Sequence, residues 1–133
     1  MVSWGSVVAV GGGAAIGAWL RWGLGMLLNP VFPTLPLGTV AANLGGGLMM
    51  GFAMEVMTRH SVMSPELRLL VTTGFLGGLT TFSTFSAEIT TLLLRREWLW
   101  SAIGICVHVV GSVLLTILGI LLMRWLIASG SPS

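Results

Sequence analysis

The chain has 133 residues, of which 55% are hydrophobic and only 8% are charged. A soluble domain carries about 25% charged residues, so this composition excludes an ordinary soluble enzyme or binding domain. The net charge of +2 comes from arginines and glutamates, and no basic cluster exceeds the pair Arg95-Arg96, so a nucleic-acid partner is not expected. Apolar runs of about 20 residues or more predict an all-α multi-pass membrane protein with one domain over residues 1–133.

The first expected span covers about residues 4–28. Gly13, Gly17 and Arg21 recur at every fourth position and therefore share one helix face. Small residues at that spacing allow a second helix to approach closely. Arg21 is flanked by tryptophans, and two interpretations stay open. It is either an arginine that extends to the membrane interface or one at the mouth of a pore.

Prolines within residues 29–36 end the first helix, and the second span is expected over about 37–57. Asn43 places an amide in mid-span, where it needs hydrogen-bond partners. It either bonds to another helix or offers its N–H groups to a permeating anion. The row of residues spaced by four that contains this amide is Thr39, Asn43, Gly47, Gly51 and Glu55.

The third expected span covers about residues 67–94, which is longer than one crossing of about 20 residues requires. Its middle, GFLGGLTTFSTFSAE, combines glycines, hydroxyls, two phenylalanines and a carboxylate. Hydrocarbon does not accept this mixture unless the polar groups face protein or a water-filled path. We therefore predict that this helix is broken in mid-membrane between Gly77 and Thr80.

Two rows of side chains separate after the predicted break. Phe82 and Phe85 begin an aromatic and aliphatic row, while Thr84 and Glu88 begin a polar row beside the hydroxyl of Ser83. An aromatic row is usually plain packing, but next to hydroxyls and a backbone break it indicates the wall of a path. An ionised Glu88 would repel an anion, so this carboxyl is protonated, bonded to neighbouring hydroxyls on its own helix, or turned away.

The fourth expected span covers about residues 98–127, and a short polar tail is expected over 128–133. We expect the polar residues of this span to face the polar row of the third span, and the imidazole of His108 to be neutral and bonded to a hydroxyl. The row, again spaced by four, is Gly104, His108, Ser112 and Thr116.

The arginines do not favour either orientation in the membrane. Four spans place both termini on one side, and the two sides then hold three arginines each: Arg59, Arg68 and Arg124 on one, and Arg21, Arg95 and Arg96 on the other. Because an excess of positive residues normally sets orientation, this chain is expected to insert both ways. Two opposite copies then form an antiparallel dual-topology homodimer, which resembles the inverted repeats of transporters.

Three segments, GGAAIGAWLRW, GTVAANLGGGLMMG and GFLGGLTTFSTFSAE, closely resemble those of the Fluc fluoride channels, also called the CrcB family. The resemblance extends over all four spans. It implies a multi-pass protein of the bacterial cytoplasmic (inner) membrane, surrounded by lipid, through which fluoride leaves the cytoplasm passively. It also implies an antiparallel homodimer with two separate pores.

The same resemblance implies the roles of particular residues. Phe82 and Phe85 would line each pore, with Asn43 nearby, and Arg21 would lie near a vestibule. A polar track would consist of Ser83, Thr84, Glu88 and Ser112. A structural sodium ion at the dimer centre would be bound by the backbone carbonyls of Gly77 and Thr80 from both chains.

Two other functions stay open beside the channel. A small dual-topology exporter coupled to protons would use a membrane glutamate, and Glu88 is available, although such exporters carry theirs in the first span. A scaffold subunit without transport would give Phe82 and Phe85 no part in ion flow. An enzyme is not expected, because the sequence shows no catalytic serine or cysteine motif and no metal-ligand cluster.

Overall fold

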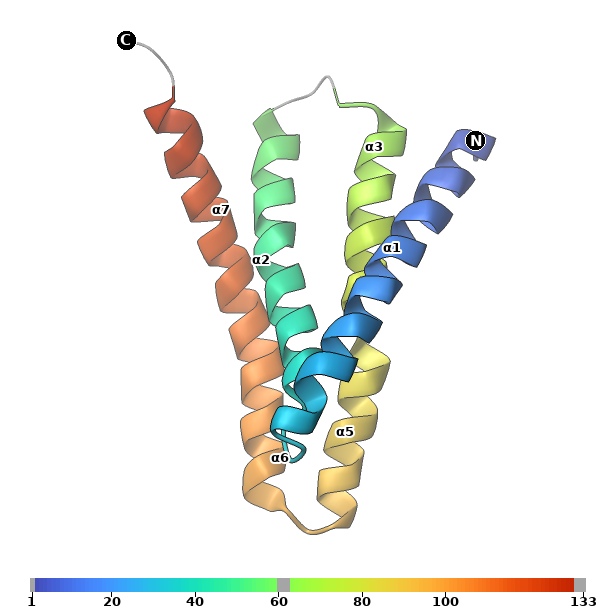
Figure 1. Ribbon diagram of the computed structural model, residues 1–133. Coiled ribbons are helices and arrows are strands. Elements are labelled where there is room, and N and C mark those ends of the chain that lie inside the picture. The colour runs from blue at the N-terminus through green and yellow to red at the C-terminus, as the bar shows by residue number, and fades with distance from the viewer. Residues whose placement is uncertain (1, 60–62, 131–133) are drawn as a thin grey trace.

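The computed structural model describes residues 2–59 and 63–130. Within these ranges the chain forms four helical rods packed side by side, with no strand, and the predicted all-helical fold is confirmed for this part of the chain (Figure 1). By length and composition, three helical runs in it are apolar enough to cross a membrane: Trp4–Val31, Leu37–Arg59 and Trp98–Ser129.

The first two rods begin and end close to the predicted positions. Helix α1 (Trp4–Leu28) runs into the short 3₁₀ turn η1 (Asn29–Val31), and the prolines of the loop then prevent a longer helix. Helix α2 (Leu37–Arg59) begins against Asn29, whose Oδ1 accepts a hydrogen bond from the Gly38 N–H at 2.8 Å. This amide satisfies a free donor at the start of α2 and joins the two rods.

The third rod is divided by Thr80 and Thr81. These residues are extended, with ψ of 154° and 115°, so neither part reaches the roughly 20 residues of one span. Gly77 and Gly78 remain helical, and the interruption therefore lies later than its predicted beginning at Gly77. The elements of this rod are α3 (Pro65–Leu69), the π-helical η2 (Leu70–Leu76), α4 (Gly77–Leu79) and α5 (Phe82–Leu94).

The fourth rod is continuous but also contains a wide turn. Its elements are α6 (Trp98–Ile105), the π-helical η3 (Cys106–Gly111) and α7 (Ser112–Ser129). Isolated π-helical turns inside α-helices occur frequently at functional sites. Helix α7 continues to Ser129, so the polar tail predicted from residue 128 begins later than expected; residues 131–133 of that prediction lie outside the described residues.

Close contact between glycine-bearing helix faces fixes the arrangement of the rods. Helix α1 packs against η2 and α4, where a Cβ on Gly13 or Gly17 would overlap backbone atoms of the third rod. Helix α2 packs against α7, where Gly51 and Gly119 face each other's backbone in the same way. The predicted close approach of a helix to the Gly13–Gly17 face is confirmed.

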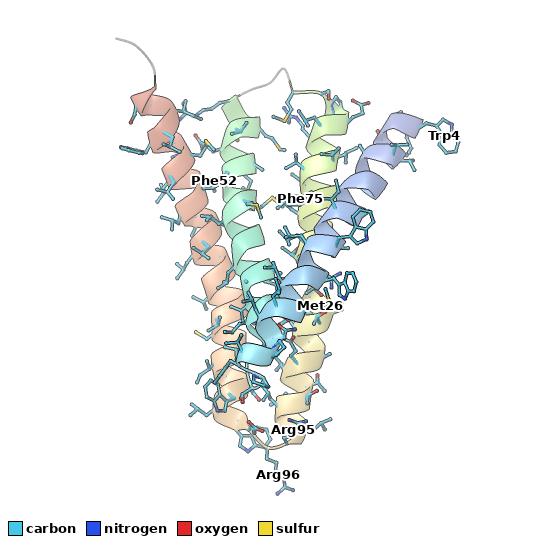
Figure 2. All side chains as sticks on the ribbon, in the orientation of Figure 1. Trp4, Met26, Phe52, Phe75, Arg95 and Arg96 are labelled. Atoms are coloured by element: carbon cyan, nitrogen blue, oxygen red, sulfur yellow. The ribbon has the colours of Figure 1, made fainter. Side chains whose placement is uncertain are left out.

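The two ends of the bundle carry different groups. The beginning of α1, marked by Trp4, and the end of α7 lie at one end, while Arg95 and Arg96 lie at the other, in the turn between α5 and α6 (Figures 1 and 2). In that turn Arg96 adopts a φ of 60°, a left-handed conformation that usually requires glycine.

Candidate functional site

The site is built around Thr81, at the point where the third rod stops being a helix. The N–H of Thr81 donates to Oδ1 of Asn43 at 2.7 Å, and Nδ2 of Asn43 donates to the Thr81 carbonyl at 3.0 Å. One amide from α2 thus pairs with both backbone polar groups of an extended residue. Unpaired backbone groups are costly in an apolar environment, so Asn43 is what allows the helix to open here.

The interruption also removes the helical donors of the carbonyls just before it, among them those of Gly77 and Thr80. In a continuous helix the N–H groups of Thr81 and Thr84 would donate to the carbonyls of Gly77 and Thr80. Here the Thr81 N–H donates to Asn43 instead, and the Thr84 N–H donates to the hydroxyl of Thr81 at 3.1 Å. The two carbonyls that the resemblance assigned to sodium are therefore among those that have lost their helical donors.

Arg21 lies level with the interruption. Its Nε donates to the carbonyl of Gly78 at 3.0 Å, seven residues before α1 ends at Leu28. The guanidinium satisfies a further carbonyl of the opened turn, because the Phe82 N–H that would normally bind this carbonyl begins the next helix. Arg21 is therefore closer to the middle of the bundle than an arginine at a helix end would be.

A groove of about 500 Å³ lies beside the interruption, and we call it the central groove. It brings together the predicted pore residues Asn43, Phe82, Phe85 and Ser112 with the predicted sodium ligands Gly77 and Thr80. Its other lining residues are Gly46, Gly47, Met50, Thr72, Leu76, Thr81, His108, Val109, Val113 and Thr116.

The two phenylalanines of the central groove differ in their surroundings. Their rings meet edge to face, with centroids 5.5 Å apart. Phe82 is 78% exposed, whereas Phe85 is 8% exposed and packs in a cluster with Ile89 and Leu92. The row predicted from the sequence is therefore divided. The ring of Phe82 is exposed at the groove, and the other members of the row belong to the core.

The predicted polar track does not form one continuous line in this chain. Ser83 and Thr84 lie around the hydroxyl of Thr81, with oxygen–oxygen distances of 3.3 and 3.0 Å, and Ser112 lines the central groove. Glu88 lines a different pocket, of about 360 Å³, beside the loop between α1 and α2. There Glu88 accepts a hydrogen bond from the hydroxyl of Thr39 at 2.6 Å.

The hydrogen-bond donor to Glu88 is not among those considered from the sequence. The sequence leaves three states open for this carboxyl, of which one is bonding to hydroxyls of its own helix, and the donor is Thr39 of α2. The hydroxyl of Thr91 turns to the Ala87 carbonyl, and the hydroxyl of Thr84 accepts from that of Thr81. Thr39 stands four residues before Asn43, and this spacing was the signal that both residues face the third rod.

His108 differs from the prediction in its hydrogen-bond partner. We expected a hydroxyl, but its Nδ1 is 3.0 Å from Nδ2 of Asn43. Its ring contacts that of Phe85 with centroids 4.8 Å apart, so it does face the third rod. The row of the fourth rod therefore meets α2 as well as α5. Thr116 confirms the contact with α2, because its hydroxyl donates to the Gly47 carbonyl at 2.9 Å.

A second polar cluster lies at the other end of the row of α2 residues spaced by four. The buried carboxylate of Glu55 accepts from Nε of Arg59 at 2.7 Å and from Nη2 of Arg124 at 3.0 Å. Arg59 is on the same helix and Arg124 is on α7, so this cluster joins α2 to the fourth rod. The side chains of both arginines remain partly exposed, at 41% and 57%, which limits the energetic value of the pairs.

Comparisons with known proteins find related sequences over most of the chain. A family profile described as "CrcB-like protein, Camphor Resistance (CrcB)" matches residues 8–120. A protein of Nitrosospira multiformis named "Fluoride-specific ion channel FluC" is 59% identical over 121 residues, which cover 91% of this chain and 94% of that protein. Proteins of the same name from Aromatoleum aromaticum and Thiobacillus denitrificans are 61% identical over 112 residues (84% of this chain, 86% of that protein) and 52% identical over 119 residues (90% and 96%).

Proposed function

The chain belongs to the CrcB-like protein family, and from this premise we propose that it is a passive, fluoride-selective ion channel of the bacterial cytoplasmic (inner) membrane. The observation that carries the proposal is the central groove, where an interrupted helix places the rings of Phe82 and Phe85 beside the amide of Asn43. Fluoride is proposed as the ion because the relatives are named fluoride-specific ion channels.

The lining of the central groove suits a small, strongly hydrated anion. An unpaired ion that enters a low-dielectric medium faces a penalty on the order of 20 kcal/mol on an ideal Born estimate, so its path must replace water with donors. Hydroxyls, amide N–H groups and the positive edges of aromatic rings provide partial positive charge without holding the ion tightly. No arginine or carboxylate is among the described lining residues, so no full charge would trap or repel the ion there.

We further propose that the channel is an antiparallel homodimer with two pores, one for each central groove. A single chain leaves the central groove open, and a second copy would close it. The even division of the arginines supports insertion in both orientations. In this arrangement the third span is broken in mid-membrane, and the interruption at Thr80 and Thr81 becomes part of the dimer centre.

A structural sodium ion at that centre is consistent with the freed carbonyls. Gly77 and Thr80 offer two carbonyl oxygens per chain without helical donors, and both residues border the central groove. Two copies would hold the cation with four such oxygens, and a bound cation supplies positive charge near an anion path. The residues of this chain would keep the carbonyls in place, Asn43 by holding Thr81 and Arg21 by binding Gly78.

The test of the function is fluoride efflux from liposomes that contain the purified protein. We expect a passive flux that needs no proton gradient and that strongly favours fluoride over chloride, and we expect it to be lost in Phe82→Ala. Efflux that depends on a proton gradient would support the exporter that uses Glu88. Efflux that is absent would support a scaffold subunit, and efflux unchanged by Phe82→Ala would remove Phe82 from the ion path.

The dimer and its cation have separate tests. Reporter fusions at the C-terminus are expected to show both orientations in equal amounts, and a single orientation would contradict the antiparallel dimer. Replacement of sodium by a larger organic cation is expected to reduce the flux and the thermal stability of the dimer. Equal flux and stability in both salts would remove sodium from the proposal.

A further inference from the structure

His108 is a buried polar residue to which the channel proposal gives no role. It lies on the π-helical turn η3, borders the central groove, and is 5% exposed. Its Nε2 is buried and has no hydrogen-bond partner within the described part of the chain. Most buried side-chain nitrogens have such a partner, so this one requires an explanation.

The hydrogen bonds of Asn43 determine which nitrogen of His108 carries the proton. The N–H of Thr81 can only donate, so the Asn43 atom 2.7 Å from it must be the oxygen. The other end of the amide is then the NH₂ group, which donates to the Thr81 carbonyl and to Nδ1 of His108. Because Nδ1 accepts, the proton of the neutral ring is on Nε2, and Nε2 is an unused donor.

The imidazole that carries the unused donor lies against the aromatic wall of the groove. The imidazole is tilted by 38° against the ring of Phe85, and the rings of Phe85 and Phe82 meet edge to face. Asn43 fixes the plane of the imidazole and its tautomer, so the N–H is oriented before any ion arrives. A fixed donor that is screened from water is the kind of group that binds a dehydrated anion most strongly.

We propose that the Nε2–H of His108 binds fluoride as the ion passes Phe85, and that it contributes to the preference for fluoride over chloride. This inference rests on the channel function and adds a residue to it, with Asn43 as the positioning residue. Fluoride is the smaller anion and the stronger acceptor, so it gains more from one short N–H bond. A buried N–H that lacks a hydrogen-bond partner lowers the stability of the fold. A role in binding a passing fluoride ion would explain why the chain keeps this donor.

The first test observes the nitrogen directly in the full-length protein, reconstituted in lipid nanodiscs. The chain has two histidines, so His60→Asn leaves a single imidazole for ¹⁵N NMR. We expect the tautomer protonated on Nε2, and a saturable downfield shift of its proton with sodium fluoride but not with sodium chloride. The tautomer protonated on Nδ1, or a proton whose chemical shift does not change with fluoride, would overturn the inference.

The second test separates the donor from the shape of the side chain. His108→Phe and His108→Gln both remove the Nδ1 that accepts from Asn43, but only glutamine carries an N–H at about the reach of Nε2. We expect about tenfold lower fluoride flux and weaker discrimination against chloride in His108→Phe, the effect of one lost bond to a charged group. In His108→Gln we expect the discrimination to be largely restored.

Three outcomes distinguish the two proposals. If the wild-type protein carries no fluoride, the channel proposal fails. If the wild-type protein conducts and His108→Phe matches it in flux and selectivity, only the role of His108 fails. If both variants lose flux equally while the melting temperature and the dimer fraction stay at wild-type values, His108 acts only as the acceptor for Asn43, and the role of Nε2 is overturned.

Discussion

Helix α2 carries two polar clusters on one face, and they differ in how completely their groups are bonded. At the interruption, neutral groups of Asn43, Thr81 and His108 bond to one another and leave carbonyls and an imidazole N–H unused. At the other end, both oxygens of Glu55 are bonded to arginines. Gly47 and Gly51 lie between the two clusters and hold α7 close.

The difference indicates which cluster serves ion flow. A cluster whose charges are paired within the chain has no capacity left for a passing ion, and its effect is to hold two helices together. A cluster of neutral groups with unused donors and acceptors beside a groove can exchange partners with an ion at little cost. Mutations in the two clusters should therefore separate stability from conduction.

The largest effect is expected from Asn43→Ala. The change removes partners from the N–H and carbonyl of Thr81 and from Nδ1 of His108, so flux should fall to background and the free energy of unfolding should drop by about 2 kcal/mol or more. Asn29→Ala is the matched control. It removes only the amide that caps α2, which should cost about 1 kcal/mol and leave the flux intact. Near-normal flux in Asn43→Ala would show that the interruption does not depend on this amide.

The two phenylalanines of the central groove offer the next comparison. Both Phe82→Ala and Phe85→Ala should reduce fluoride flux strongly. Only Phe85→Ala should also lower stability, by about 3 kcal/mol, because its ring is buried in a core cluster. Phe82→Ala should stay within about 0.5 kcal/mol of wild type. Denaturation in mild detergent, measured beside efflux, checks both; an equal loss of stability would place Phe82 in a packed interface.

Glu55→Gln tests the opposite cluster. It removes the negative charge that pairs with Arg59 and Arg124, so the melting temperature should fall, and the difference from wild type should shrink in high salt. The flux per folded channel and its preference for fluoride should stay at wild-type values. Flux must be normalised to the folded dimer measured by size-exclusion chromatography, and a changed selectivity would extend the site to this end of α2.

The sequence was sufficient to predict the helices and the region of the interruption. Prolines after Asn29 and the polar turn at Arg95 fix helix ends by local chemistry, and these ends lie within a few residues of prediction. The break was also predictable, because hydroxyls and glycines inside an apolar run indicate a backbone that needs other partners. Its position was less accurate, since glycine permits an opening but the amide of Asn43 determines where it occurs.

The partners of the polar residues could not be predicted in the same way. A repeat of four shows that residues share a face, but not which helix that face meets, because this depends on the rotation and depth of each rod. Glu88 therefore bonds to Thr39 of α2 rather than to hydroxyls of its own helix, and His108 bonds to Asn43. These rotations are set where the backbones at Gly13 and Gly51 contact other helices closely. The residues in contact there are far apart in the sequence, so a local pattern does not reveal them.

Thr116→Val should have the smallest effect and shows where the conducting cluster ends. Thr116 lies between the two clusters; its hydroxyl donates to the Gly47 carbonyl of α2 and its side chain borders the central groove. Valine keeps the shape and removes one bond between membrane helices, worth about 0.6 kcal/mol, so stability should fall only slightly and flux by less than about twofold. A tenfold loss of flux at unchanged stability would instead make this hydroxyl a donor to the ion, and the path would then extend along α7 toward Glu55.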